Sequence, residues 1–412
     1  MKQNITDHLD DPEGLERLYR ENKREFAREF PGIAGDTDSE LVRFWKIRLV
    51  FARDAARPFS IPDLLAVLSI SLLTALLVKL PAIFTGIGET FFYTRDLAVV
   101  VFNGLILYFF IRNRIRATWM ILYGAAILAL LLYVNLLPSR EGDSLNIAFA
   151  HVPLFLWCLS GMAFISFDFG DTGKRMEFIR FNGELLIMAG LLLITGGILT
   201  AITIGLFQAI GTSIEKPYLE YIVIPGSAVS PILAAYLISL YPDITRRIIP
   251  VIARVFTPIV LVTLVIYLVS LAFSGARVLE DRELLTLFNV MLVAVTAIIV
   301  FSVTELDKTR NRNIHVLILL CLAIVTLVIN SVALTAIITR LTYGITPNRA
   351  VVVITNVLVF INLILIAKDL FRSWVIAGKL ASLEKTVANY LTVYFLWTAI
   401  AIFLLPVLFG FK

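Results

Sequence analysis

Residues 314–339 read IHVLILLCLAIVTLVINSVALTAIIT, with no Asp, Glu, Lys or Arg. A bilayer core about 30 Å thick is crossed by about 20 apolar helical residues, so this run is long enough for one span. The whole chain has the same character, because 59% of its 412 residues are hydrophobic and only 16% are charged. Soluble domains hold roughly 45–50% apolar and about 25% charged residues. The composition therefore excludes a soluble globular protein.

Ten more runs of this kind follow one another along the chain, separated by short charged breaks. Together they predict an all-α protein, a polytopic transmembrane helical bundle of about eleven spans. The expected spans are 61–81, 97–111, 118–137, 145–167, 182–211, 219–241, 248–273, 284–304, 314–339, 350–367 and 387–409. An even number of spans is the alternative, because 97–111 is short. We expect the bundle to occupy 59–412, after a short helical cytoplasmic segment over 1–58.

Lysine and arginine are distributed unequally between alternate loops. One set of loops carries roughly twice as many lysines and arginines as the other. Short loops that are rich in cationic residues are retained on the cytoplasmic side of the membrane. The richer set is 112–117, 168–181, 242–247, 305–313 and 367–386. The poorer set is 85–96, 138–144, 212–218, 274–283, 340–349 and 410–412. We therefore expect a multi-pass plasma-membrane protein with a cytoplasmic N-terminus and an external C-terminus.

The first 60 residues are polar, with acidic residues dominating 1–40 and basic residues dominating 41–60. Asp11 before Pro12 predicts a helix that runs to about Phe30, where Pro31 ends it. A second helix is expected to begin after Asp38 or Ser39.

The segment 41–57 combines aromatic residues such as Phe44 and Trp45 with several arginines and lysines. Aromatic rings at the headgroup level and cations facing anionic lipid are typical of an interfacial helix. We therefore expect membrane lipids as partners, with anionic lipid at 41–57. The alternative is a juxtamembrane helix that only follows the positive-inside bias. No nucleic-acid module accompanies the basic stretch, so nucleic acid is not an expected partner.

Prolines interrupt the sixth and seventh predicted spans. Pro225 and Pro231 flank Ser227 and Ser230, and such a break can expose backbone groups to a cavity. A simple kink is the alternative, because proline is common in membrane helices. Arg254 lies two turns into the seventh span, where it can bind freed carbonyls or extend to the headgroups.

Three other spans carry signals for helix packing. Asn330 lies in the ninth span, and Asn356 and Asn362 lie in the tenth. An amide in lipid needs a hydrogen-bonding partner, so we expect these three residues to face other helices. Gly197, Ala201 and Gly205 form a stripe of small residues in the fifth span, which predicts the close approach of a neighbouring helix.

The turn between the ninth and tenth predicted spans is the least generic part of the sequence. It reads RLTYGITPNR over residues 340–349. Gly344 permits a turn, and Thr346 can cap a helix whose first position is Pro347. Tyr343 suits a membrane interface. Arg340 and Arg349 are cationic residues on the side expected to be external, against the positive-inside bias, so we expect a partner to hold them.

Tyr343, Gly344, Thr346 and Arg349 also carry a resemblance. The sequence is similar to the bacterial integral-membrane family catalogued as domain of unknown function 4153. Members of that family have, between two late spans, a tyrosine, a glycine, a leucine or isoleucine, a threonine and, three residues later, an arginine. The likeness extends in layout over residues 60–410. It implies a bacterial inner-membrane protein and no particular reaction.

No catalytic motif occurs in the chain: neither HExxH, nor a Walker loop, nor GxSxG. We expect no metal and no cofactor, since two cysteines and three histidines form no recognisable ligand set. The leading hypothesis is a transporter-like protein that binds or moves a small or lipidic solute. A non-transporting scaffold or sensor subunit is the alternative, a membrane-embedded enzyme is third, and an oligomer or protein partner stays open. The candidate substrate-binding residues are Arg254, Pro225, Ser227, Ser230, Asn330, Tyr343 and Arg349.

Overall fold

The protein is helical throughout the described part of the chain, which contains no strand. A computed structural model describes residues 2–21, 23–33, 39–55, 60–84, 86–140, 142–209, 212–274, 282–306, 314–375 and 380–412. The predicted all-α fold class is confirmed. Most of the predicted loops 274–283 and 305–313, and residues 56 and 57 of the predicted lipid-binding segment, lie outside the described residues.

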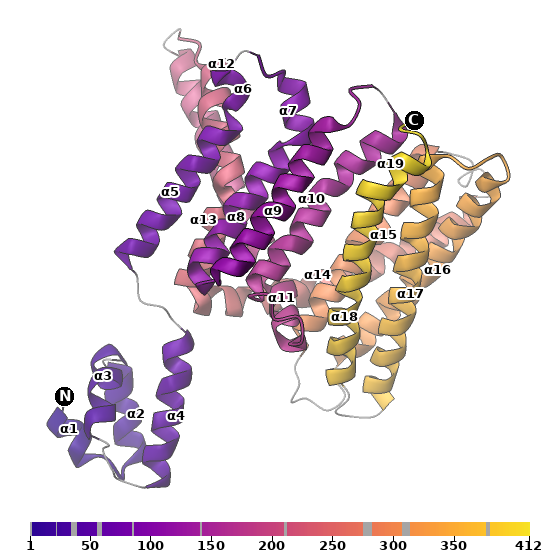
Figure 1. Ribbon diagram of the computed structural model, residues 1–412. Helices are drawn as coiled ribbons and strands as arrows, with labels where there is room; N and C mark the ends of the chain where they lie inside the picture. The colour runs from indigo at the N-terminus through magenta and orange to yellow at the C-terminus, as the bar shows by residue number, and fades with distance from the viewer. Residues whose placement is uncertain are drawn as a thin grey trace. The chain divides into compact units, whose positions relative to one another are not determined.

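The chain divides into two compact units. The first comprises Met1–Ser60 with Ser239–Pro242, and the second comprises Ile61–Ile238 with Asp243–Lys412. The N-terminal part of the first unit contains α1 (Lys2–Asp7), α2 (Pro12–Glu21), α3 (Lys23–Ile33) and α4 (Glu40–Ala55) (Figure 1). Its core consists of Ile5, Leu15, Leu18, Phe26, Phe30, Val42, Trp45 and Leu49.

The sequence predicts the start of α2 at Pro12 correctly, but the single helix expected to end at Phe30 is two helices. The second of them, α3, continues through Pro31 to Ile33. Phe30 is fully buried in the core of this unit, and this packing favours a helical last turn in spite of the proline. At the start of α4, the Ser39 hydroxyl accepts a hydrogen bond from the backbone N–H of Val42 at 3.1 Å, as an N-cap does.

Trp45 is a core residue and not the headgroup anchor that the sequence predicts. Its side chain is 1% exposed. Arg48 lies 4.5 Å above its ring and pairs with Glu16 at 2.6 Å. Hydrogen bonding from Arg20, together with the charge of Arg48, lowers the pKa of the Glu16 carboxyl. Trp45 and Arg48 therefore hold α4 against α2.

The second unit is a bundle of long helices (Figure 1). Its first half contains α5 (Ile61–Val78), α6 (Leu80–Ile83), α7 (Glu89–Arg95), α8 (Leu97–Asn113), α9 (Ala117–Leu136), α10 (Asp143–Phe164) and α11 (Thr172–Ala209). Its second half contains α12 (Glu215–Tyr218), η1 (Leu219–Val223), α13 (Ile224–Leu240), α14 (Pro242–Ser274), α15 (Arg282–Thr304), α16 (Ile314–Leu341), α17 (Pro347–Val375), α18 (Leu380–Ala399), η3 (Ile400–Leu404) and α19 (Leu405–Leu408). The elements η1 and η3 are single π-helical turns.

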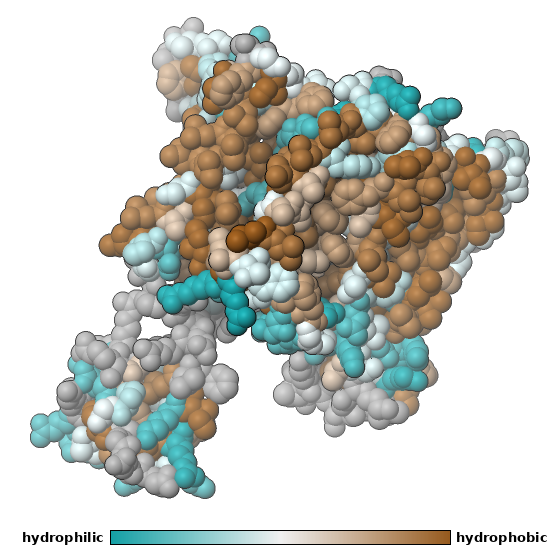
Figure 2. Space-filling view, in the orientation of Figure 1, coloured by the Kyte–Doolittle hydropathy of each residue, from teal (hydrophilic) through white to brown (hydrophobic). Residues whose placement is uncertain are grey.

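Each of the eleven predicted runs falls on a helix of this unit. Among the described residues, eight helices are long and apolar enough to cross a membrane, and α7 with α8 makes a ninth if this pair, bent by 47°, is one span. The helices α14 and α15 contain shorter apolar stretches, Ala253–Val269 and Phe288–Thr304. Hydrophobic side chains cover much of the helical surface in Figure 2, while hydrophilic residues gather toward the loops. The chain is therefore a multi-pass membrane protein.

Two apolar clusters form the interior of the bundle. One joins α5, α8, α9, α10 and α13 around residues such as Ile106, Leu156 and Ile232. The other joins the start of α11 to α14, α15, α16, α17 and α18 around Leu292, Leu322 and Leu363. The helix α10 belongs to the first cluster and contacts α17 and α18 of the second, so it links the two clusters.

The stripe of small residues in α11 does not pack as the sequence predicts. A Cβ atom built at Gly197 or Gly205 would meet nothing within 4 Å. The most apolar part of α11 also contains no buried residue. No described helix of the same chain fills this face, because α11 packs through its first turns, around Met176 and Ile179.

Arg95 closes one end of α9. Its guanidinium donates to the carbonyl oxygens of Val134, Leu137 and Pro138 at 2.6, 2.9 and 3.1 Å. It also lies 4.4 Å from the ring centroid of Phe91. The last carbonyls of a helix lack partners within the helix, so a buried arginine satisfies them where water cannot reach.

We expect Arg95→Met to lower the free energy of unfolding by about 2–4 kcal/mol, because it leaves three carbonyls without their donor. The measurement is denaturant unfolding in detergent micelles. Arg140→Met is the matched control, because the exposed Arg140 also donates to two carbonyls, those of Gly410 and Phe411. Equal losses for the two variants would contradict the role given to burial.

Candidate functional site: a polar seam between two helices

A line of polar contacts joins α17 to α18, and we call it the α17–α18 seam. It contains four hydrogen bonds between the two helices. Trp397 Nε1 donates to Thr355 Oγ1 at 3.1 Å, the Tyr390 hydroxyl to the Leu358 carbonyl at 2.6 Å, Asn362 Nδ2 to the Tyr394 hydroxyl at 2.8 Å, and the Thr386 hydroxyl to Asp369 Oδ2 at 2.6 Å.

The spacing of these residues places them on facing sides of two antiparallel helices. On α17 the positions 355, 358, 362 and 369 are three, four and seven residues apart, which keeps them on one helix face. The distance along the helix from Thr355 to Asp369 is about 21 Å at 1.5 Å per residue. The seam therefore covers much of a hydrocarbon core that is about 30 Å thick.

The seam is buried among apolar residues. Asn362 is 1% exposed and Asp369 is 5% exposed. Their neighbours on α17, Leu363, Ile366 and Leu370, are fully buried. Hydrogen bonds between membrane helices contribute about 0.6 kcal/mol each on average, so the four together contribute only about 2–3 kcal/mol. Such bonds hold two helices together and can still be exchanged for bonds to a solute.

A second group of amides lies on another side of α17. Asn356 Nδ2 donates to Asn289 Oδ1 of α15 at 2.8 Å. Asn330 Nδ2 of α16 donates to the backbone carbonyl of Asn356 at 3.2 Å. This confirms the prediction that Asn330 faces another helix, and it makes α17 the helix to which polar contacts converge from three neighbours.

Two amide oxygens in this region are buried and accept no hydrogen bond within the described part of the chain. They are Asn330 Oδ1 and Asn362 Oδ1. A buried acceptor that lacks a donor costs about 1–3 kcal/mol. Each oxygen can therefore accept a hydrogen bond from a water or from a hydroxyl, amine or amide group of a solute.

At its Trp397 end the seam approaches α10. The rings of His151 and Trp397 meet edge to face, with their centroids 6.3 Å apart. His151 Nδ1 donates to the Ile147 carbonyl of its own helix at 2.8 Å, and this bond sets the orientation of the imidazole.

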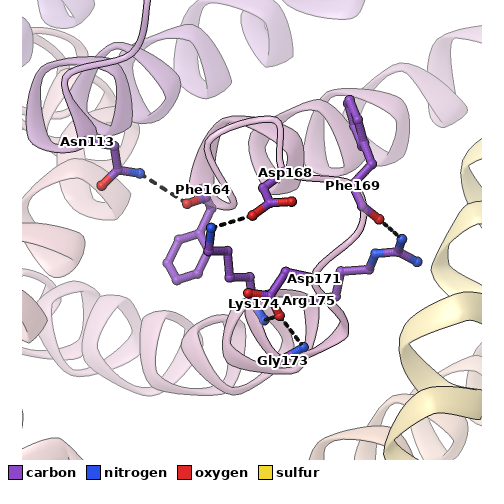
Figure 3. Close-up of polar contacts among 8 residues, drawn as sticks. All are labelled: Asn113, Phe164, Asp168, Phe169, Asp171, Gly173, Lys174 and Arg175. Atoms are coloured by element: carbon purple, nitrogen blue, oxygen red, sulfur yellow. Dashed lines mark hydrogen bonds and ion pairs between the residues drawn. The ribbon is translucent and has the colours of Figure 1, made fainter.

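At the opposite end of the bundle, the turn between α10 and α11 is fixed by several polar contacts (Figure 3). Asn113 donates to the carbonyl of Phe164 at 3.0 Å, which satisfies the end of α10. The Asp171 carboxylate accepts the backbone N–H of Gly173 at 2.8 Å and so caps the start of α11. Lys174 bonds to Asp168 at 2.7 Å, and this contact lowers the pKa of the Asp168 carboxyl.

Arg175 connects the same turn to α18. Its guanidinium donates to the Phe169 carbonyl, which Figure 3 shows, and to Asn389 Oδ1 at 3.2 Å. One turn further along α11, Arg180 pairs with Glu305 at the end of α15 at 2.8 Å. The start of α11 thus fixes the ends of α15 and α18 at this side of the bundle.

Contacts between loops agree with the alternation that the charge distribution predicts. The backbone N–H of Ser144 donates to the Lys412 carbonyl at 2.8 Å, and Asn348 donates to Asp143 at 2.7 Å. These contacts join loops 138–144, 340–349 and 410–412, which all belong to the set that is poorer in lysine and arginine. The contact between Arg180 and Glu305 joins loops 168–181 and 305–313, which both belong to the richer set.

The structure separates the candidate residues derived from the sequence. Pro225, Ser227 and Ser230 lie on α13, which is a continuous helix preceded by the π-helical turn η1. The Ser230 hydroxyl donates to the Ser227 carbonyl of the same helix at 2.8 Å, while the Ser227 side chain is exposed. Arg254 is exposed on α14.

The candidates in the 340–349 turn hold the turn itself. Arg349 donates from its guanidinium to the Gly344 carbonyl at 2.8 Å and from its backbone N–H to Thr346 Oγ1 at 3.3 Å. Gly344 has φ +109°, which an L side chain rarely adopts. Tyr343 is 81% exposed. Among the described residues, no hydrogen bond or ion pair joins this turn to Arg254, to Asn330 or to the α13 serines.

Of the residues in the seam, the sequence pointed only to Asn362. Asp369 was counted with a loop, because the expected span ended at residue 367, whereas α17 extends to Val375. The signal available was the repeat of polar residues at 355, 362 and 369, which matches two turns of helix. The aromatic partners on α18 were not identifiable, because tyrosine and tryptophan are common near membrane interfaces.

Comparisons of the chain with family models, with curated proteins and with solved structures gave no match.

Thr386→Val is expected to lower the free energy of unfolding by about 1–3 kcal/mol, because it removes the donor to the buried Asp369 carboxyl without changing side-chain shape. Thermal unfolding in detergent measures the loss. Thr335→Val is the control, because the hydroxyl of the exposed Thr335 donates to the Ser331 carbonyl within its own helix. If the two variants lose the same free energy of unfolding, the seam has no special role in stability.

Proposed function

We propose that this multi-pass membrane protein is transporter-like, and that it binds or moves a small or lipidic solute along the α17–α18 seam. The observation that carries the proposal is the seam itself, a buried polar line about 21 Å long between two membrane helices. Polar residues inside membrane helices are rare and mark pathways for solutes or ions.

The chemistry of the buried groups favours one class of solute. On the seam, the Asn362 amide oxygen lacks a donor among the described residues, and the Asp369 carboxyl lies two turns further along α17. The Asn330 amide oxygen, on α16 beside another side of α17, also lacks a described donor. Acceptors select a solute that donates hydrogen bonds, through hydroxyl, amine or amide groups. An apolar tail on the solute fits the leucine and isoleucine neighbours of the seam.

We propose further that the protein resides in a bacterial inner membrane, with its N-terminus in the cytoplasm and its C-terminus outside. The excess of lysine and arginine in one loop set supports this orientation. The resemblance of the 343–349 turn to the family catalogued as domain of unknown function 4153 supports the bacterial assignment. This topology requires the loops of each set to lie together at one end of the bundle. The contacts within the poorer set and within the richer set support this arrangement.

Asn362→Leu is expected to reduce solute movement by tenfold or more, because it removes both an acceptor and the bond to Tyr394. The measurement compares a deletion strain carrying the wild-type gene with one carrying the variant, by untargeted mass spectrometry of cell and medium extracts. A solute or lipid whose distribution depends on the wild-type gene is the readout.

Asn103→Leu is the matched control for this experiment. Asn103 lies in α8, and its amide is satisfied on both sides, by the Val99 carbonyl at 2.7 Å and the Tyr123 hydroxyl at 2.6 Å. It should lower stability and leave the solute distribution as in wild type. If Asn362→Leu lowers stability equally and changes no distribution, the seam is only a packing device and the proposal fails.

The topology predicts opposite accessibility for Tyr343→Cys and Gly170→Cys, each in a background with Cys158→Ala and Cys321→Ala. Both positions are exposed, and a Cβ at Gly170 meets only Asp168, at 3.8 Å. A membrane-impermeant maleimide added to intact spheroplasts should label position 343 and not position 170. Labelling of position 170 alone would show that the orientation is the opposite of the proposed one. Labelling of both positions would contradict their placement on opposite sides of the membrane.

A further inference from the structure

The helix α4 presents a second apolar surface, separate from the one in the core of its unit. Phe44 and Ile47 are 55% and 59% exposed, whereas Val42 and Trp45 are buried. At 100° per residue, the exposed pair lies on one side of the helix and the buried pair on the other. Two exposed apolar side chains one turn apart form a compact apolar surface.

Cations flank this surface. Arg43 and Lys46 are both exposed. At 100° per residue they follow the Ile47 edge of this surface, Arg43 about 40° and Lys46 about 100° around the helix from Ile47. Glu40 is exposed on the same side, between the directions of Phe44 and Ile47, but it lies in the first turn, at the end of α4 farther along the chain from the first span. Apolar side chains bordered by basic residues are the composition that an anionic lipid surface binds.

The covalent chain keeps this surface near a membrane. The helix α4 ends at Ala55, and the first apolar span begins at Ile61. Fully extended, the chain from residue 55 to residue 61 reaches at most about 20 Å. From Ile47 to the end of α4 the helix adds about 12 Å. The headgroup layer is therefore within reach of α4 wherever α5 enters the bilayer.

We propose that the α4 surface, consisting of Arg43, Phe44, Lys46 and Ile47, binds the headgroup region of an anionic leaflet. Phe44 and Ile47 insert beside the acyl chains, and Arg43 and Lys46 contact lipid phosphates. Trp45 takes no part, because the core of the unit holds it. The inference is independent of the α17–α18 seam.

The test uses the full-length protein in nanodiscs with a spin label at Ile47→Cys, in the background with Cys158→Ala and Cys321→Ala. The discs contain either phosphatidylcholine alone or phosphatidylcholine with phosphatidylglycerol. Collision with oxygen reports immersion in lipid, and collision with a water-soluble nickel complex reports exposure to water. Arg17→Cys, at an exposed position on α2, is the control site.

The expected result is a label at 47 that oxygen reaches better than nickel in discs with phosphatidylglycerol, while the label at 17 stays aqueous. A label at 47 as aqueous as that at 17 overturns the proposal. Equal immersion in both kinds of disc overturns the selection for anionic lipid. A label shielded from both reagents overturns it too, because a protein surface then covers α4.

A second arm keeps Phe44 in place and changes only exposed charges. Arg43→Gln with Lys46→Gln should lower the ratio of immersed to aqueous label about 5-fold per cation, and so about 25-fold together. High salt should have a similar effect on the parent protein, because it screens the attraction. An unchanged ratio shows that these cations do not bind lipid.

Discussion

Hydrogen bonding in a medium that offers no hydrogen bonds is the constraint on which this structure depends. Helices satisfy their own backbone groups, but the ends of each helix and every polar side chain in the bilayer need partners from the protein. Arg95 supplies them for the end of α9, and Asn113 supplies them for the end of α10. Side chains that appear isolated in the sequence therefore close the bundle at both of its ends.

The same constraint makes α17 the central helix of the second apolar cluster. Asn356 binds toward α15 and α16, while Asn362 and Asp369 bind toward α18. Each bond is weak alone, and two amide oxygens keep free acceptor capacity in the described structure. An interface of this kind holds the helices together, and its unused acceptors are what the proposed binding of a hydrogen-bond donor requires. A purely apolar interface between the same helices would offer a solute nothing to bind.

The N-terminal unit shows how packing divides similar residues between different roles. Phe44 and Trp45 are neighbours in the sequence and equally suited to a membrane interface. Packing against Phe26 and Phe30 buries Trp45, and Arg48 covers its ring and binds Glu16. Phe44 remains outside. Periodicity alone could not decide which side of α4 faced the core, because apolar residues occur on both sides.

The sequence by itself determined the membrane class, the helical bundle, the positions of the apolar runs and the cap at Thr346 before Pro347. These features follow from length, composition and local chemistry, which act within a few residues. Only the tertiary structure decided which polar residues meet. Asn362 and Tyr394, Asp369 and Thr386, and Arg180 and Glu305 come from different helices, and no local rule pairs them. The tertiary structure also leaves Arg254 exposed, and it places no described neighbour within 4 Å of a Cβ at Gly197 or Gly205 of α11. Lipid and protein cover an apolar helix face equally well, so the sequence alone does not distinguish them.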